Sequence, residues 1–242
     1  MIQRDLIRTA LVALTTGASV FVAGCGGSDA PQSSGSGFNA NSEDATYEVT
    51  FTAQWTTANG FGSVPSSAHF SSVIGSAVNE QSALWESGQA SSPGMEGVAE
   101  NGTTQVFSAE IATEAAANAA SGVVNMGGTQ ANNSVSAEIT FTRSFPLFTF
   151  ASMVAPSPDW FVGQSKFSML GASSEWINDA QLNLRVYDAG TEDGNSFSGN
   201  NAASNPLDVI KRLNGLVAGE LNFVDGLVNG NAIASIQLTR IR

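Results

Sequence analysis

Acidic side chains that could bind a cation lie in two short stretches, each directly after an apolar segment. The first apolar segment is Phe145–Met153, and Pro156 and Pro158 follow it. Proline has no N–H to donate, so these two residues end any sheet ladder that the segment forms. Asp159 comes directly after this stop, and we expect it in a loop at a strand end, with the two aromatic residues that follow packing the loop down.

The second stretch follows a segment in which apolar and polar residues alternate, Leu182–Tyr187. This alternation predicts a strand that ends at Asp188. Glu192 and Asp193 come shortly afterwards, among glycines that permit a tight turn. Two strand ends that each deliver carboxylates to a loop favour a hard-cation site, because calcium takes oxygen ligands and tolerates irregular loops. The alternative is that these acids only form turns, in which Asp is common.

Catalytic arrangements have little support in the sequence. His69 is the only histidine, so a zinc site built on several histidines is excluded, and no Gly-x-Ser-x-Gly stretch presents a nucleophilic serine. Asp159 and Glu192 could form the acid pair of a glycoside hydrolase, which also needs aromatic side chains that stack on sugars. Each tryptophan lies in or beside an apolar segment and is expected in the core: Trp55, Trp85, Trp160 and Trp176. We therefore expect no enzyme and assign no catalytic residue.

Two motifs resemble the spondin N-terminal domain of the F-spondin and mindin family. Ser152–Gly163 reads Ser-Met-Val-Ala-Pro-Ser-Pro-Asp-Trp-Phe-Val-Gly, and Tyr187–Thr191 reads Tyr-Asp-Ala-Gly-Thr. Ala68–Ser71 and Leu84–Gly88 add weaker matches in the family's order, over about Thr46–Arg242. The resemblance implies an all-β fold, a C2-like antiparallel β-sandwich with long loops, that binds one calcium ion and takes part in extracellular adhesion.

The resemblance also implies the metal ligands. Family ligands carried over position by position fall on Asp159, Asp188 and Glu192. Glu192 departs from the family pattern, which more often has Asp there. The longer side chain could still reach the ion, or Asp193 could replace or join it, and both alternatives stay open.

The composition limits the partners and the sources of stability. The formal net charge is −12, and lysine occurs only at positions 166 and 211, so an acidic surface that repels nucleic acid is expected. Cys25 is the only cysteine, which excludes a disulfide within the chain. Stability should therefore depend on core packing and on calcium.

The N-terminal residues predict a lipid anchor. Residues 1–24 have two arginines, an apolar segment too short to span a bilayer, and the small residues Val22-Ala23-Gly24 before Cys25. This pattern is typical of a bacterial lipoprotein signal peptide, with lipidation at Cys25; the alternative is an ordinary signal peptide followed by a chance cysteine. Gly26 after the cysteine favours the outer membrane or cell surface. Residues 25–45, rich in Gly and Ser, are expected to form a flexible tether.

The remaining residues, 46–242, are expected to form one sandwich domain. Alternating or densely apolar segments predict its strands: Thr46–Trp55, Val135–Thr142, Phe145–Met153, Phe167–Leu170, Leu182–Asp188 and Ile233–Ile241. His69–Val78 is read as a loop or a short strand, and one short helix is expected within Gly97–Asn118. Long loops are expected over residues 122–134 and 193–205.

Taken with the resemblance, these features predict a surface-anchored, calcium-binding, spondin-like adhesion or binding domain of the cell envelope or extracellular matrix. Its partner would be an extracellular protein or a glycan. Two alternatives remain: a calcium-dependent glycan-processing enzyme, and a purely structural envelope lipoprotein.

Overall fold

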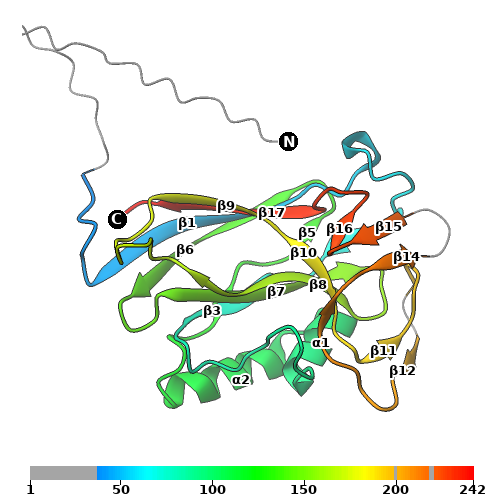
Figure 1. The fold of residues 1–242 in the computed structure, drawn as a ribbon, viewed down its shortest axis with the longest axis horizontal. Helices are drawn as coiled ribbons and strands as arrows, with labels where there is room; N and C mark the ends of the chain where they lie inside the picture. The colour runs from blue at the N-terminus through cyan, green and yellow to red at the C-terminus, as the bar shows by residue number, and fades with distance from the viewer. Residues whose placement is uncertain (1–36, 199–200, 218–220) are drawn as a thin grey trace, which may run out of the picture. The chain divides into compact units, whose positions relative to one another are not determined.

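Two antiparallel sheets lie face to face in the computed structural model of the chain, which describes residues 37–198, 201–217 and 221–242 (Figure 1). The predicted signal peptide, the lipidation site Cys25 and most of the predicted tether lie outside the described residues. Residues 38–242 form one compact unit. The expected all-β sandwich is confirmed.

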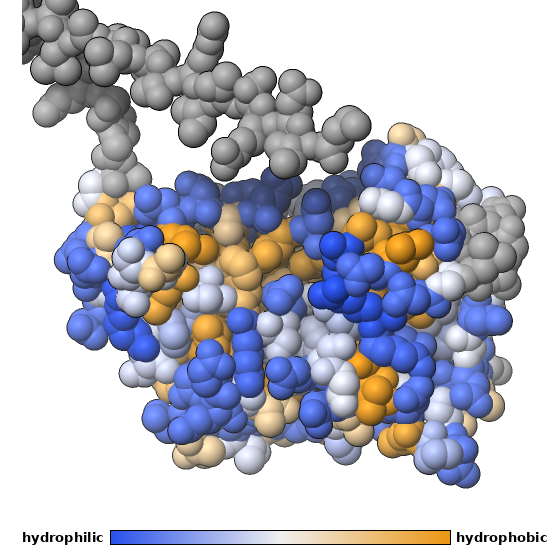
Figure 2. Space-filling model, viewed as in Figure 1, coloured by the Kyte–Doolittle hydropathy of each residue, from blue (hydrophilic) through white to orange (hydrophobic). Residues whose placement is uncertain are grey.

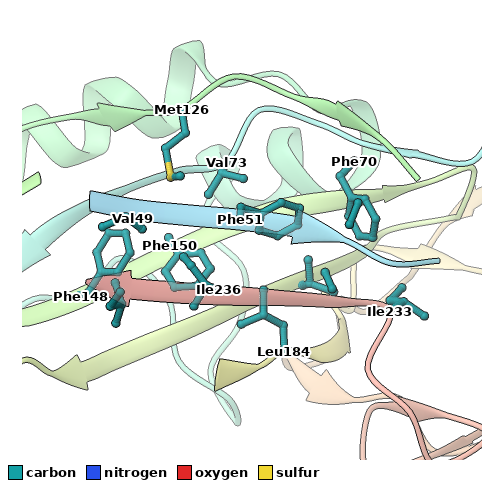
Figure 3. Close-up of a cluster of buried hydrophobic side chains, with 14 of the residues drawn as sticks. Val49, Phe51, Phe70, Val73, Met126, Phe148, Phe150, Leu184, Ile233 and Ile236 are labelled. Carbon is teal, nitrogen blue, oxygen red and sulfur yellow. The ribbon is translucent and has the colours of Figure 1, made fainter. Parts of the chain in front are cut away.

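The smaller sheet has four strands. In spatial order they are β6 (Ser134–Thr142), β1 (Asp44–Ala53), β17 (Ala234–Arg240) and β9 (Asp179–Asn183). The strand pattern read from the sequence for β1 is confirmed, because alternate side chains from Tyr47 to Ala53 are buried. Figure 3 shows Val49 and Phe51 of β1 and Ile236 of β17 close to Phe148 and Phe150 of the other sheet.

The larger sheet carries the acidic loops. Its main path is β13 (Lys211–Arg212), β10 (Arg185–Asp188), β8 (Trp160–Ser168), β7 (Leu147–Ala155), β2 (His69–Phe70) and β5 (Thr129–Gln130). A branch adds β3 (Ile74–Val78), which pairs with β7 and with β4 (Val124–Asn125). Smaller elements are β11 (Glu192–Asp193), β12 (Ala202–Ala203), β14 (Gly215–Val217), β15 (Leu221–Val224), β16 (Leu227–Val228) and the 3-10 helix Thr57–Asn59.

Two strand boundaries read from the sequence are wrong. The segment Leu182–Asp188 is not one strand: it changes sheets at Leu184, whose N–H still bonds to Ala234 O at 3.0 Å in the smaller sheet. The residues after Asp159 are not a packed loop, because β8 begins at Trp160 and ends at Ser168, inside the strand expected at Phe167–Leu170. Around Trp160 the residues face apolar layers on both sides, which hides the period of two, whereas at Leu184 the alternation continues although the strand changes sheets.

Two helices occur where one was expected, α1 (Pro93–Asn101) and α2 (Gln105–Ala116). Ser92 starts α1 by accepting a hydrogen bond from Met95 N at 3.1 Å, and Gly102, at a φ of 65°, ends it. The two helices cover the outer face of the larger sheet (Figure 1). Their apolar side chains form a second core with those of that sheet. No helix of the described residues is both long and apolar enough to cross a membrane.

The molecular surface is mostly polar. On the face shown in Figure 2, hydrophilic residues separate the apolar surface into small patches. The large apolar side chains that are exposed are few and spread over the chain: Val106, Val123, Leu207, Val209 and Val224.

Candidate functional site

Strand pairing brings the two acidic stretches together. β8 and β10 are neighbours in the larger sheet, and their register places Trp160 opposite Asp188. Asp159 directly precedes Trp160, the first residue of β8, and therefore lies beside the end of β10. The N–H of Ala189 donates to the main-chain oxygen of Asp159 at 3.1 Å, which extends the contact past the strand ends.

A serine between the two prolines fixes the approach to Asp159. The Ser157 hydroxyl donates to Val154 O at 2.5 Å and accepts from Trp160 N at 3.1 Å. It thus provides hydrogen-bond partners for main-chain groups on both sides of the turn, where the two prolines have no N–H to donate. The turn is buried, so Asp159 enters the protein interior in one orientation.

The Asp159 carboxylate is fully buried and only half satisfied. Its Oδ2 accepts hydrogen bonds from Thr191 N at 2.7 Å and Glu192 N at 3.1 Å, and the Thr191 hydroxyl lies 3.3 Å away. Its Oδ1 has no hydrogen-bond partner among the described residues. A buried carboxylate oxygen without a partner is costly, so this atom is a natural ligand for a cation.

Asp188 is the second acid at this position. Its Oδ1 accepts from Gly190 N at 2.9 Å, and burial together with the negative charge of Asp159 raises its pKa to about 6. Gly190 has a φ of 75°, and a Cβ there would lie 2.5 Å from Asp208 O, so the turn requires glycine. The ammonium of Lys211 acts in the opposite direction and lowers the pKa of Asp188.

Glu192 and Asp193 have different surroundings, although they are adjacent. Partial burial and, to a smaller extent, the charge of Asp159 raise the pKa of Glu192. The exposed Asp193 accepts a hydrogen bond from the Ser204 hydroxyl at 2.7 Å. Successive residues of a strand point to opposite sides, which separates the two carboxylates. The structure therefore groups Glu192, rather than Asp193, with the buried acid.

A further carboxylate, that of Glu100 in the last turn of α1, lies near Asp159 and Glu192. Glu100 was not predicted from the sequence as part of the acidic site. Its pKa is raised by burial and by the charges of Glu192, Glu96 and Asp159, while a hydrogen bond with the Thr191 side chain lowers it. Glu100 lies far from the other acids along the chain, in a segment with no metal-ligand spacing. The only local signal is its position just before the helix-ending Gly102.

Comparison with known proteins shows the family of the chain. The family model Spondin_N matches residues 45–220, which include every acidic residue described above. The chain belongs to the Spondin_N family. The resemblance seen in Ser152–Gly163 and Tyr187–Thr191 is confirmed.

Relatives of this Spondin_N chain are larger proteins. Spondin-2 of Homo sapiens is 32% identical over 176 residues, which cover 70% of this chain and 52% of spondin-2. Spondin-1 of Rattus norvegicus is 28% identical over 187 residues, covering 75% of this chain and 23% of spondin-1. The chain thus spans about half the length of the first relative and about a quarter of the second.

The acidic loops of the Spondin_N domain surround a pocket of about 420 Å³. Its charged lining consists of Asp188, Glu192, Asp193, Asp208 and Lys211. The Lys211 ammonium lies 2.5 Å from Asp208 Oδ2, so its positive charge is held at the rim of the pocket. No group of three or more His, Cys, Asp or Glu side chains within the described part of the chain is close enough to hold a metal alone. A bound ion would therefore also need main-chain oxygens or water, as calcium commonly does.

The only histidine and the four tryptophans have structural surroundings. His69 lies in β2, and its Nδ1 is 2.8 Å from Ser67 O. All four tryptophans are buried, with at most 4% of their surface exposed: Trp55, Trp85, Trp160 and Trp176. They contribute to the core, and among the described residues no aromatic side chain lines the acidic pocket.

Proposed function

We propose that this Spondin_N domain is a calcium-dependent binding or adhesion module, held at the surface of the cell envelope by a lipid on Cys25. The ion would be held by Asp159, Asp188 and Glu192, whose loops would draw closer together on binding, and the charge of Glu100 would add to the negative field. When bound, it would neutralise these charges and hold the loops of β8, β10 and α1 together.

The unpartnered Oδ1 of the buried Asp159 is the observation that carries the calcium site. The protein fixes Oδ2 with two main-chain N–H groups and leaves Oδ1 unused. Burial first, and then the charges of neighbouring carboxylates, raise the pKa values of Asp188, Glu192 and Glu100. A divalent cation would relieve both penalties.

Calcium suits this donor set better than other common ions. Every candidate ligand is an oxygen, whereas structural zinc sites use Cys or His. The ligands come from irregular loops of different elements, and calcium accepts six to eight oxygens in flexible geometry. Magnesium demands near-ideal octahedral geometry, which such loops do not readily supply.

Adhesion or binding follows from the family and from the chemistry of the pocket. The relatives bear the name spondin, and this chain corresponds to a part of each of them. A polar, acidic pocket with no stacking aromatic favours recognition over glycan cleavage. The expected partner is an extracellular protein or a glycan, bound through or beside the ion.

Thermal unfolding in calcium, magnesium and chelator tests the site. Calcium at a hundred times its dissociation constant should stabilise the domain by about 2.7 kcal/mol, and magnesium by much less. Asp159→Asn keeps one oxygen for the N–H groups and replaces the other with an amide that cannot bind a cation, so it should lose most of this gain. An identical midpoint in all three solutions would refute the proposal. Calcium-dependent turnover of a polysaccharide, lost in Asp159→Asn, would favour the glycan-processing enzyme instead.

A further inference from the structure

Strand β6 forms one edge of the smaller sheet, and its outer side has no neighbouring strand in the described part of the chain. It is nine residues long and pairs with β1 over its whole length without a register shift. A straight edge of this length presents a row of main-chain donors and acceptors to any strand that can approach it.

The hydrogen bonds at the two ends of β6 show which residues point outward. Asn133 O accepts from Ala53 N at 2.9 Å, and Arg143 N donates to Glu43 O at 2.9 Å. In an antiparallel pair, every second residue bonds to the same neighbour. Odd-numbered residues of β6 therefore bond to β1, and the main-chain groups of the even-numbered residues point away from it. Thr142 O is occupied by Phe145 N at 3.0 Å. The other outward residues are Ser134, Ser136, Glu138 and Thr140.

β6 lacks the features that usually protect an edge. Its sequence, Ser-Val-Ser-Ala-Glu-Ile-Thr-Phe-Thr, contains no proline and no lysine. On the side facing the core, Val135 and Ala137 stay partly exposed, whereas Ile139 and Phe141 are buried. A pocket of about 440 Å³, lined in part by Phe70 and Val135, opens beside the start of the strand. The rest of the pocket lining is mostly polar, and an added strand would cover the exposed parts of Val135 and Ala137.

We propose that β6 pairs with β6 of a second copy of this chain, antiparallel, around a two-fold axis at Ala137. In this register Ser134 lies opposite Thr140 of the other copy, and Ser136 opposite Glu138. Hydroxyl then meets hydroxyl and hydroxyl meets carboxylate, both favourable cross-strand pairs. The small Ala137 lies at the axis, and Val135 packs against Ile139. The two smaller sheets become one continuous sheet.

Charge disfavours one neighbouring register and limits the affinity. Shifting the axis to residue 138 would place Glu138 opposite itself, and shifting it to residue 136 would leave Thr140 beyond the partner strand. Arg242 lies 2.7 Å from Glu138 and compensates its charge. The whole chain has a net charge of −12, so two copies repel, and the dimer should strengthen as salt rises.

Proline substitutions at the two edges of the sheet test the interface. Ser136→Pro removes an N–H that points outward from β6 and leaves the pairing with β1 intact. Gln181→Pro is the matched control, because β9 bonds to β17 through its even-numbered residues and Gln181 points outward at the other edge. By sedimentation equilibrium in 0.15 M and about 1 M salt, Ser136→Pro should weaken dimerisation at least tenfold, and Gln181→Pro should leave it unchanged. The reverse result would overturn the proposal.

A cross-link tests the register even if a proline variant fails to fold. In the full chain carrying Cys25→Ser, Ala137→Cys would provide the only thiol, at a position that meets its own copy on the axis. Non-hydrogen-bonded pairs have Cα atoms about 4.5 Å apart, within reach of a disulfide. Mild oxidation should give a covalent dimer, and Thr52→Cys on the adjacent strand should not. A protein that stays monomeric at all concentrations and forms no cross-link refutes the dimer.

Discussion

Replacing Asp188 by asparagine should change the stability of the metal-free and calcium-bound protein in opposite directions. Folding raises the pKa of Asp188 from 3.8 to about 6 through burial and the charge of Asp159. A carboxyl whose pKa is raised by folding favours the folded state at low pH, and this contribution is lost as the pH rises from about 4 to about 6. At neutral pH the ionised Asp188 is therefore a liability without a cation.

The size of the effect follows from the shift. Two pKa units correspond to about 3 kcal/mol, and solvent at the pocket rim reduces this to about 1 kcal/mol. The introduced asparagine side chain would stay neutral and could still accept the Gly190 N–H, so metal-free Asp188→Asn should be more stable at pH 7.5 by about this amount. For a domain of this size, that raises the unfolding midpoint by roughly 2–4 °C.

Scanning calorimetry at pH 7.5, with chelator and with calcium, measures both directions. Calcium should raise the wild-type midpoint and have little effect on Asp188→Asn. At pH 4 the metal-free variants should converge, because Asp188 is then protonated. The control is Asp193→Asn, which alters an exposed acid bound to Ser204 and should keep the full calcium response. Loss of stability in chelator, or an unchanged calcium gain in Asp188→Asn, would refute the reasoning.

Further predictions concern the acid on α1, the loop after β11 and the anchor. Glu100→Gln should reduce the calcium-induced rise in midpoint while stabilising the metal-free protein at pH 7.5, and an unchanged calcium response would remove Glu100 from the site. The ring centroid of Phe197 lies 4.9 Å from that of Trp55 and 5.2 Å from that of Trp160. Phe197→Ala should therefore lower the free energy of unfolding, measured in urea, by about 2 kcal/mol. A decrease under about 0.5 kcal/mol would mean that Phe197 does not anchor the loop. Cys25→Ser should release the protein from membranes or leave it unprocessed, and intact-mass data showing an unmodified mature N-terminus elsewhere would contradict the lipid anchor.

Much of the sandwich could be predicted because β1 buries one face and exposes the other, while β7 is buried on both faces and forms a continuous apolar run. The alternation in β1 and the apolar run of β7 located those strands to within two residues at most ends. The break at Leu184 could not be predicted, because a strand that passes from one sheet to the other keeps the same alternation through the crossing. The second helix was missed because the helical pattern continues across Gly102, and only its left-handed φ ends α1.

Part of the candidate site could likewise be predicted from the sequence, and part could not. The sequence by itself determined the acidic residues Asp159, Asp188 and Glu192 and their positions after apolar segments, because proline, glycine and alternation act locally. Only the tertiary structure decided that β8 and β10 are neighbours, that Asp159 is buried with one oxygen unsatisfied, and that Glu100 of α1 joins the group. Burial and charge proximity depend on contacts between segments far apart in the chain, and no local spacing encodes them.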